Sequence, residues 1–142
     1  MSIETTGAPR IYPTFRYRDA EAMIAWLEDA FGFSVRAKYM ANGKVSHAEL
    51  AFGSSIIMLG SVRADAYGDH VGAPGSGSAG KSTYIAVPDA DAVYATAKAA
   101  GAKILEELTD RDYGSREFIC ADPEGHVWAF GTYWPKAGEP AL

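Results

Sequence analysis

Two segments of this chain, about seventy residues apart, begin in the same way. Residues 17–23 read Tyr-Arg-Asp-Ala-Glu-Ala-Met, and residues 87–93 read Val-Pro-Asp-Ala-Asp-Ala-Val. Each follows a strand-like run, opens a helical stretch that stops at Gly32 or Gly101, and precedes three further strand-like runs. A repeated supersecondary unit needs a neighbour to bury its apolar face, and two copies are too few for a solenoid. We therefore predict two βαβββ modules in a paired, closed arrangement.

The bounds of each element follow from periodicity and from capping residues. Asp19 and Asp89 are good helix N-caps, and Asn42-Gly43 is a hairpin-turn signal. The predicted elements are a strand at 11–17, a helix at 20–31 and strands at 33–40, 44–52 and 55–60, then a strand at 82–88, a helix at 90–100 and strands at 103–108, 115–121 and 126–133. The prediction is an α+β fold in a single domain, 1–142. Its parts are module one at about 10–60, a flexible Gly/Ser-rich linker at 61–81 and module two at about 82–133.

Composition excludes several classes of protein. A net charge of −5 over 142 residues argues against a nucleic-acid surface, which needs clustered Lys and Arg. A single cysteine, Cys120, rules out an intrachain disulfide and a zinc cluster built on cysteines. There is neither a signal-peptide pattern at the N-terminus nor an apolar run long enough to cross a membrane. We expect a cytoplasmic protein that binds neither nucleic acid nor membrane.

The segment 75–82, Gly-Ser-Gly-Ser-Ala-Gly-Lys-Ser, matches the phosphate-binding P-loop pattern. A P-loop needs a buried strand before it and a helix after it, because the helix N-terminus holds the phosphate. Here the preceding residues do not form a strand pattern, and Ser82 to Val87 read as a strand. We interpret the match as a chance feature of the linker and predict that Lys81 and Ser82 do not bind a nucleotide.

Residues 122–133, Asp-Pro-Glu-Gly-His-Val-Trp-Ala-Phe-Gly-Thr-Tyr, carry a resemblance to a known superfamily. A turn of this kind leading into an apolar final strand resembles the end of a module in vicinal oxygen chelate proteins. Residues 113–118, 19–27 and 30–33 are also similar to this superfamily, especially to its glyoxalase/bleomycin-resistance branch. The resemblance covers about 10–133. It implies sheets that curl around a shared central cleft, helices on the outside, a small-molecule ligand and a homodimer, but it does not define the reaction.

Metal-dependent members of the superfamily carry His, Gln or Glu on the first and last strands of each module. Counting from the aligned landmarks places these positions at Tyr12, Met58, Ser82 and Ala129 in this chain. Such side chains do not supply the carboxylate or imidazole donors that a divalent ion needs. We therefore expect no catalytic metal and no other cofactor.

Strand alternation predicts which side chains face the cleft. If Leu50 and Phe52 lie under the first helix, His47 and Glu49 face the other way. This His/carboxylate pair suits a general base with an orienting carboxylate, or else a polar strand face that hydrogen-bonds its neighbours. A one-residue bulge would reverse the assignment.

The same alternation gives candidates on the other strands. In module one it places Tyr12, Thr14 and Arg16 toward the cleft. In module two it places Arg116, Phe118, Cys120, Val127, Ala129, Gly131 and Tyr133 toward the cleft, with Trp128 and Phe130 under the helix. The predicted ligand-binding residues are Tyr12, Arg16, Arg116 and Trp134. Tyr39, Tyr67 and Tyr133 would also suit a flat ligand, or serve as edge packing.

Two functional hypotheses remain open at this stage. The first is a metal-free binding protein that sequesters a small aromatic or cationic compound. The second is a glyoxalase-like lyase, isomerase or dioxygenase that uses His47 and Glu49 as a base or as part of a relocated metal site.

Overall fold

The computed structural model describes residues 8–75 and 80–140. The chain divides into two compact units, Met1–Pro74 and Gly75–Leu142, which we describe separately. The segment predicted to be a chance P-loop match lies partly outside the described residues. The element after this segment is the strand Thr83–Ala86 rather than a helix, as expected.

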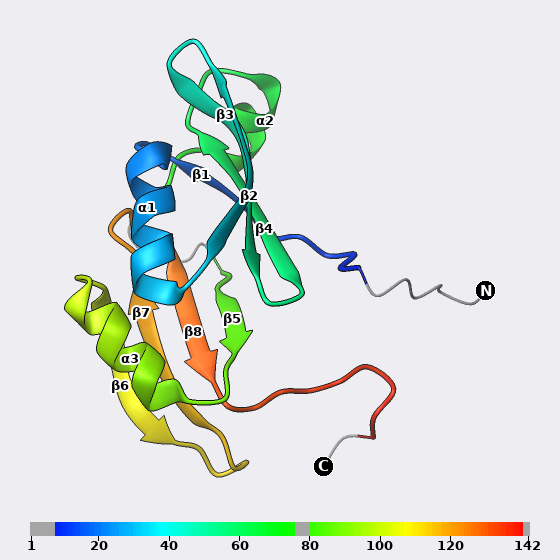
Figure 1. The fold of residues 1–142 in the computed structure, drawn as a ribbon, viewed down its shortest axis with the longest axis vertical. Helices are drawn as coiled ribbons and strands as arrows, with labels where there is room; N and C mark the ends of the chain where they lie inside the picture. The colour runs from blue at the N-terminus through cyan, green and yellow to red at the C-terminus, as the bar shows by residue number, and fades with distance from the viewer. Residues whose placement is uncertain (1–7, 76–79, 141–142) are drawn as a thin grey trace. The chain divides into compact units, whose positions relative to one another are not determined.

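The first unit contains one four-stranded sheet and two helices (Figure 1). Its elements are β1 (Thr14–Tyr17), α1 (Ala20–Phe31), β2 (Ser34–Ala41), β3 (Lys44–Phe52), β4 (Ser55–Ser61) and α2 (Ala66–Val71). The strand order is β1-β4-β3-β2, with β1 parallel to β4 and the other pairs antiparallel.

The second unit repeats this arrangement. Its elements are β5 (Thr83–Ala86), α3 (Ala90–Ala99), β6 (Lys103–Asp110), β7 (Arg116–Ala121) and β8 (Val127–Gly131). The strand order is β5-β8-β7-β6, again with only the first pair parallel. The predicted α+β fold with two βαβββ modules is confirmed, and the two helix openings found in the sequence occupy equivalent places.

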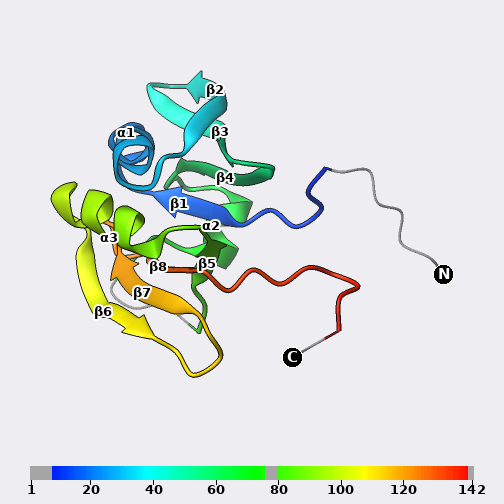
Figure 2. The ribbon, with the colours of Figure 1, turned by 60° about the horizontal axis from the view of Figure 1, so that its bottom comes forward.

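Helix α1 forms where its caps and its apolar stripe predict it. The Asp19 side chain accepts a hydrogen bond from the Ala22 amide at 3.1 Å, and Gly32 ends the helix at φ +82°. Helix α1 lies over one face of the first sheet, as Figure 2 shows, and Leu27 of this helix is fully buried. Burial of one such leucine contributes about 1.5–3 kcal/mol.

In β3 the predicted facing is confirmed. Ala48 and Leu50 are fully buried, and β3 packs against α1. His47 and Glu49 are half-buried on the opposite face. The core of the first unit therefore fixes the direction of this His/carboxylate pair.

In β7 the predicted facing is wrong. Phe118 and Cys120 are fully buried, and the Phe118 ring packs edge-on against Tyr94 of α3 at 5.3 Å between centroids. Phe118 also lies opposite Phe130 on β8, and residues directly opposite on paired strands share a face. Even-numbered residues of β7 therefore lie on the helix side, and Glu117 and Ile119 lie on the other.

The predicted flexible linker at 61–81 is also corrected. Residues Ala66–Val71 form α2, whose N-cap Asp65 accepts a hydrogen bond from the Gly68 amide at 2.7 Å. Asp65 is held in turn by contacts with two arginines, described below. Residues 65–71 are therefore held by tertiary interactions that the Gly/Ser-rich composition of the predicted linker does not indicate.

Candidate functional site

The first unit contains a cavity of about 350 Å³. It lies over β1, β3 and β4 and is closed on one side by the segment that leads into α2. We call it the first-unit cavity. Its lining residues are Thr14, Phe15, Arg16, Ser46, His47, Met58, Leu59, Gly60, Arg63, Asp65 and Tyr67.

A partly buried ion pair anchors one wall of the first-unit cavity. Arg16 is 9% exposed, and its Nη1 and Nη2 donate to the two carboxylate oxygens of Asp65 at 3.2 and 3.0 Å. The hydrogen bond from Arg16 and then that from the Gly68 amide lower the pKa of Asp65. The paired geometry fixes both side chains, as expected for a two-pronged arginine–carboxylate contact.

Tyr67 of α2 contributes an aromatic face to the same wall. The Arg16 guanidinium lies over its ring at 4.8 Å from the centroid, a cation–π distance. Its hydroxyl lies 2.7 Å from Thr14 Oγ1 on β1. Tyr67 is nevertheless 45% exposed, so part of it remains accessible to a ligand.

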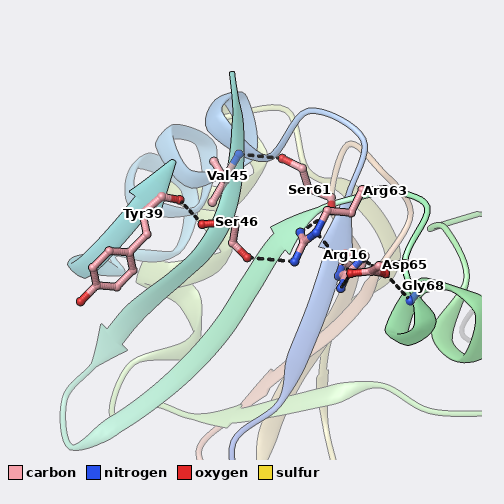
Figure 3. Close-up of polar contacts among 8 residues, drawn as sticks. All are labelled: Arg16, Tyr39, Val45, Ser46, Ser61, Arg63, Asp65 and Gly68. Carbon is pink, nitrogen blue, oxygen red and sulfur yellow. Dashed lines mark hydrogen bonds and ion pairs between the residues drawn. The ribbon is translucent and has the colours of Figure 1, made fainter. Parts of the chain in front are cut away.

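Arg63 lies across β4, as Figure 3 shows. Its Nη1 donates to the Ser61 carbonyl at 3.1 Å, its Nη2 donates to the Ser46 carbonyl at 3.2 Å, and its Nε lies 3.2 Å from Asp65 Oδ2. A Cβ atom built on Gly60 would stand 3.2 Å from Nη1. The guanidinium therefore lies close to the backbone and is held by two carbonyl hydrogen bonds and one ion pair.

His47 forms the opposite edge of the cavity and is hydrogen-bonded to Glu49. The His47 Nε2 to Glu49 Oε2 distance is 3.0 Å, and the Tyr39 ring stacks on the imidazole. The hydrogen bond with His47 and the charge of Arg36 lower the pKa of Glu49 against the opposing effect of burial. An ionised Glu49 favours the tautomer with the proton on Nε2, which makes Nδ1 the proton acceptor.

The other predicted ligand-binding residues lie elsewhere. Tyr12 donates its hydroxyl to the Pro9 carbonyl at 2.7 Å. Arg116 forms ion pairs with Asp91 of α3 and with Asp110, at 2.9 and 3.1 Å. Trp134 follows β8 and is 65% exposed. Among the predicted residues, the first-unit cavity brings together Arg16, His47 and Tyr67, and Glu49 joins them through His47.

Sequence reasoning missed Arg63 and Asp65 as site residues because both lie in the predicted linker. One available signal was Asp65 itself, a good N-cap three residues before Gly68. The other available signal was the presence of two charged residues, Arg63 and Asp65, in a segment rich in small residues. Neither signal identifies Arg16, 49 positions away, as the partner.

In the second unit, side chains fill the equivalent place. Glu117 is 9% exposed and accepts hydrogen bonds from the Tyr113 hydroxyl on both oxygens at 2.8 Å and from Arg111 Nε at 3.1 Å. Burial raises the pKa of Glu117, but the hydrogen bonds from Tyr113, Ser115 and Arg111 outweigh it and leave the pKa lowered. Tyr84 closes the cluster by donating to the Tyr133 carbonyl at 2.7 Å.

The strand register allows the expected metal positions to be examined. The counted positions Tyr12 and Ser82 precede β1 and β5. The residues opposite Met58 and Ala129 are Thr14 and Tyr84. None of these side chains is a carboxylate or an imidazole, so this donor set does not fit a divalent ion. Within residues 8–75 and 80–140, no group of three or more His, Cys, Asp or Glu side chains could hold a metal.

Two βαβββ units, each with a helix on one face of a mixed sheet, define the vicinal oxygen chelate class of fold. The chain belongs to the Glyoxalase/Bleomycin resistance protein/Dioxygenase superfamily, whose family model matches residues 11–130. It is similar to uncharacterized proteins of Mycobacterium bovis and Mycobacterium tuberculosis. Each is 30% identical over 125 residues, with 87% of this chain aligned to 82% and 74% of theirs.

Solved structures agree with this assignment. TioX from Micromonospora sp. ML1 superposes with a TM-score of 0.71 at 28% identity, covering 87% of this chain and 98% of its own. The fosfomycin resistance protein FosX from Mesorhizobium loti gives a TM-score of 0.64 at 16% identity, covering 89% and 92%. At that identity FosX shows the fold alone. Within the described part of the chain, the helices are too short or too polar to span a bilayer.

Proposed function

We propose that this protein binds a small organic molecule in the first-unit cavity and does so without a catalytic metal. The single observation that carries the proposal is the cavity itself. Its volume of about 350 Å³ falls within the range of small-molecule sites. Its lining combines apolar strand residues, such as Phe15 and Met58, with oriented polar groups, among them Arg16, Arg63 and His47, a combination that is typical of ligand pockets.

Arg16 and Tyr67 supply the binding surface in this proposal. Arg16 is fixed by Asp65, and it holds the Tyr67 ring in place from one side. A ring held in one position loses little conformational entropy when a flat ligand stacks on it. Arg116, by contrast, is held by two carboxylates beside α3, so we do not retain it as a ligand contact. Tyr12 and Trp134 remain proposed ligand contacts, although neither is among the residues that line this cavity.

The proposal is tested by titrating aromatic probes into the full chain and recording amide chemical shifts. We expect shifts concentrated in residues 14–17, 46–49, 58–60 and 63–67. Tyr67→Ala should weaken binding of the probes several-fold. Tyr133→Ala is a matched control, because Tyr133 has a similar exposure of 46% and lies outside the first unit. Equal losses in both variants would count against the cavity.

A second candidate function rests on the hydrogen bond of 3.0 Å between His47 and Glu49 at the cavity edge. In this alternative, the protein is a lyase, isomerase or dioxygenase of the glyoxalase type and His47 Nδ1 accepts a proton from the bound substrate. Metal-independent exchange of the α-protons of carbonyl probes into D₂O would support it. Glu49→Gln should slow that exchange more than it weakens probe binding, whereas equal effects would contradict the enzymatic role.

The proposal also includes a homodimer, which the superfamily resemblance implies, and a cytoplasmic location. Sedimentation equilibrium should give twice the chain mass of 15.1 kDa. A single species at the monomer mass would contradict this part and leave the cavity unaffected.

A further inference from the structure

Among the described residues, the charges that line the first-unit cavity do not cancel. Two arginines, Arg16 and Arg63, face one carboxylate, Asp65. Glu49 lies next to the cavity, but Arg36 and His47 already bind it. A surplus positive charge thus sits in the pocket of a chain whose net charge is −5. A partly buried charge is favourable when an opposite charge accompanies it.

The two arginines are not equivalent. Arg16 has a side chain only 8% exposed and shares two hydrogen bonds with Asp65. Arg63 has a side chain 35% exposed, and its closest approach to Asp65 is 3.2 Å through Nε. The carboxylate of Asp65 therefore compensates Arg16 first, and Arg63 carries the surplus.

Arg63 also has hydrogen-bond donors that its contacts do not use. A guanidinium has five N–H groups. Among the described residues, the Ser61 and Ser46 carbonyls accept hydrogen bonds from Arg63, and Asp65 forms an ion pair with its Nε. One N–H on each terminal nitrogen remains for a ligand. These three contacts fix the guanidinium in advance, so binding an oxygen there costs little conformational entropy.

Gly60 is what permits this position. A Cβ atom at residue 60 would stand 3.1 Å from the Ser46 carbonyl oxygen and 3.2 Å from Arg63 Nη1. Both distances are tighter than ordinary contacts, so a side chain at residue 60 would force the guanidinium to shift by a few tenths of an ångström. The glycine lets Arg63 lie low in the cavity and leaves the volume above it open.

We propose that the ligand of the first-unit cavity carries a carboxylate and that Arg63 binds this group across Gly60. This inference rests on the proposed function, because it names the chemical class of ligand for the same site. It favours an anionic aromatic compound over the cationic one considered from the sequence. Arg63 is then the residue that determines specificity, while Tyr67 and His47 contact the rest of the ligand.

The test uses three probes that share a naphthalene ring but differ in charge: the anion 2-naphthoate, the neutral 2-naphthamide and the cation of 2-(aminomethyl)naphthalene. Each is titrated into the full chain while the amide shifts of residues 14–17, 46–49, 58–60 and 63–67 are followed. We expect 2-naphthoate to bind about ten-fold or more tightly than the neutral amide, since a charge-assisted pair is stronger than a neutral hydrogen bond. The amine should bind most weakly.

Three variants separate the role of Arg63 from general charge effects. Arg63→Gln should abolish the preference for the carboxylate. Lys44→Gln removes one positive charge outside the cavity lining and should leave the preference intact. Gly60→Ala keeps the charge but moves the guanidinium, so it should weaken 2-naphthoate binding. This variant tests the inference independently if Arg63→Gln does not fold. Gly75→Ala is its control, because a Cβ atom at Gly75 meets nothing within 4 Å.

The outcomes distinguish this inference from the proposed function. If the amide or the amine binds in the cavity as tightly as the carboxylate, or if Arg63→Gln keeps the preference, the inference is wrong and the proposed function stands. If none of the three probes shifts the cavity residues, both are wrong.

Discussion

The hydroxyl of Tyr84 and the α-carbon of Gly131 lie so close that no side chain fits between them. A Cβ atom built on Gly131 would stand 2.5 Å from Tyr84 Oη and 2.6 Å from Glu117 Cγ. In the first unit, the equivalent Gly60 carries Arg63 and an open cavity. Equivalent glycines therefore lie beside packed side chains in the second unit and beside an open cavity in the first.

Gly131→Ala should destabilise the protein, because the added methyl group forces Tyr84 and Glu117 out of position. We expect the free energy of unfolding to fall by about 1–3 kcal/mol, as for overpacked cores. Denaturant unfolding measures it. In a Tyr84→Phe background the penalty should shrink, because one of the two close contacts disappears; an unchanged penalty would mean that Glu117 alone sets it.

Leu50→Ala and His47→Ala should differ sharply, although the two residues lie on one strand. Leu50 is fully buried, so its truncation should cost about 2–5 kcal/mol of unfolding free energy. The His47 side chain is 42% exposed, and its loss should cost less than about 1 kcal/mol. Chemical denaturation of both variants checks the facing of β3. Similar losses would contradict it.

Cys120 should be unreactive in the native protein. Burial, followed by the charge of Asp122, raises the pKa of its thiol to about 12, and the nucleophile is the thiolate. Ellman's reagent at about pH 8 should modify the native protein only at the rate of local opening, and should modify the unfolded protein at once. Because Cys120 is the only cysteine, the absorbance change reports this site alone. Fast native modification would place the thiol at the surface.

Asp65→Asn should change how stability depends on pH. The hydrogen bond from Arg16 lowers the pKa of Asp65 below its usual value of 3.8 in the folded protein. A carboxylate with a lowered folded pKa contributes stability above the unfolded pKa, and this contribution disappears as pH falls through the folded value. Melting temperatures measured from about pH 6 down to about pH 2 should therefore fall less steeply in Asp65→Asn than in the wild type.

Asparagine is a suitable replacement because it remains a good N-cap for α2, so the variant removes mainly the charge. Asp69→Asn is the control, since Asp69 lies on the same helix. A parallel shift of both acid profiles would remove the special role of Asp65.

Much of the fold could be predicted from the sequence because its signals are local. Asp19 and Gly32 define the ends of α1 through contacts with residues only a few positions away. The repeat of the same pattern in the second unit strengthens the prediction. The facing of β3 followed from Leu50, because the apolar residues of this strand occupy mainly one face.

The facing of β7 could not be predicted in the same way. Both of its faces carry apolar residues, with Phe118 and Cys120 on one and Ile119 and Ala121 on the other. Alternation alone therefore cannot distinguish them, and only the pairing of Phe118 with Phe130 does.

Helix α2 was missed for a different reason. A helix of six residues is far too short to form by its own propensity. Its N-cap is held by Arg16, 49 positions earlier. That contact is non-local, and the composition of the segment gives no sign of it. The part of the candidate site that depends on Arg63 and Asp65 was therefore hidden for the same reason as the helix.

Asp65 serves three structures at once: it begins α2, neutralises Arg16 and fixes the Nε of Arg63. We therefore expect substitutions at residues 16, 63 and 65 to be coupled in related proteins. A lineage that exchanged Arg63 to accept a different ligand would also alter the electrostatic balance on which the helix start depends. Related proteins with other ligands should therefore differ at these three positions together. The length of the helix that corresponds to α2 should also differ among them.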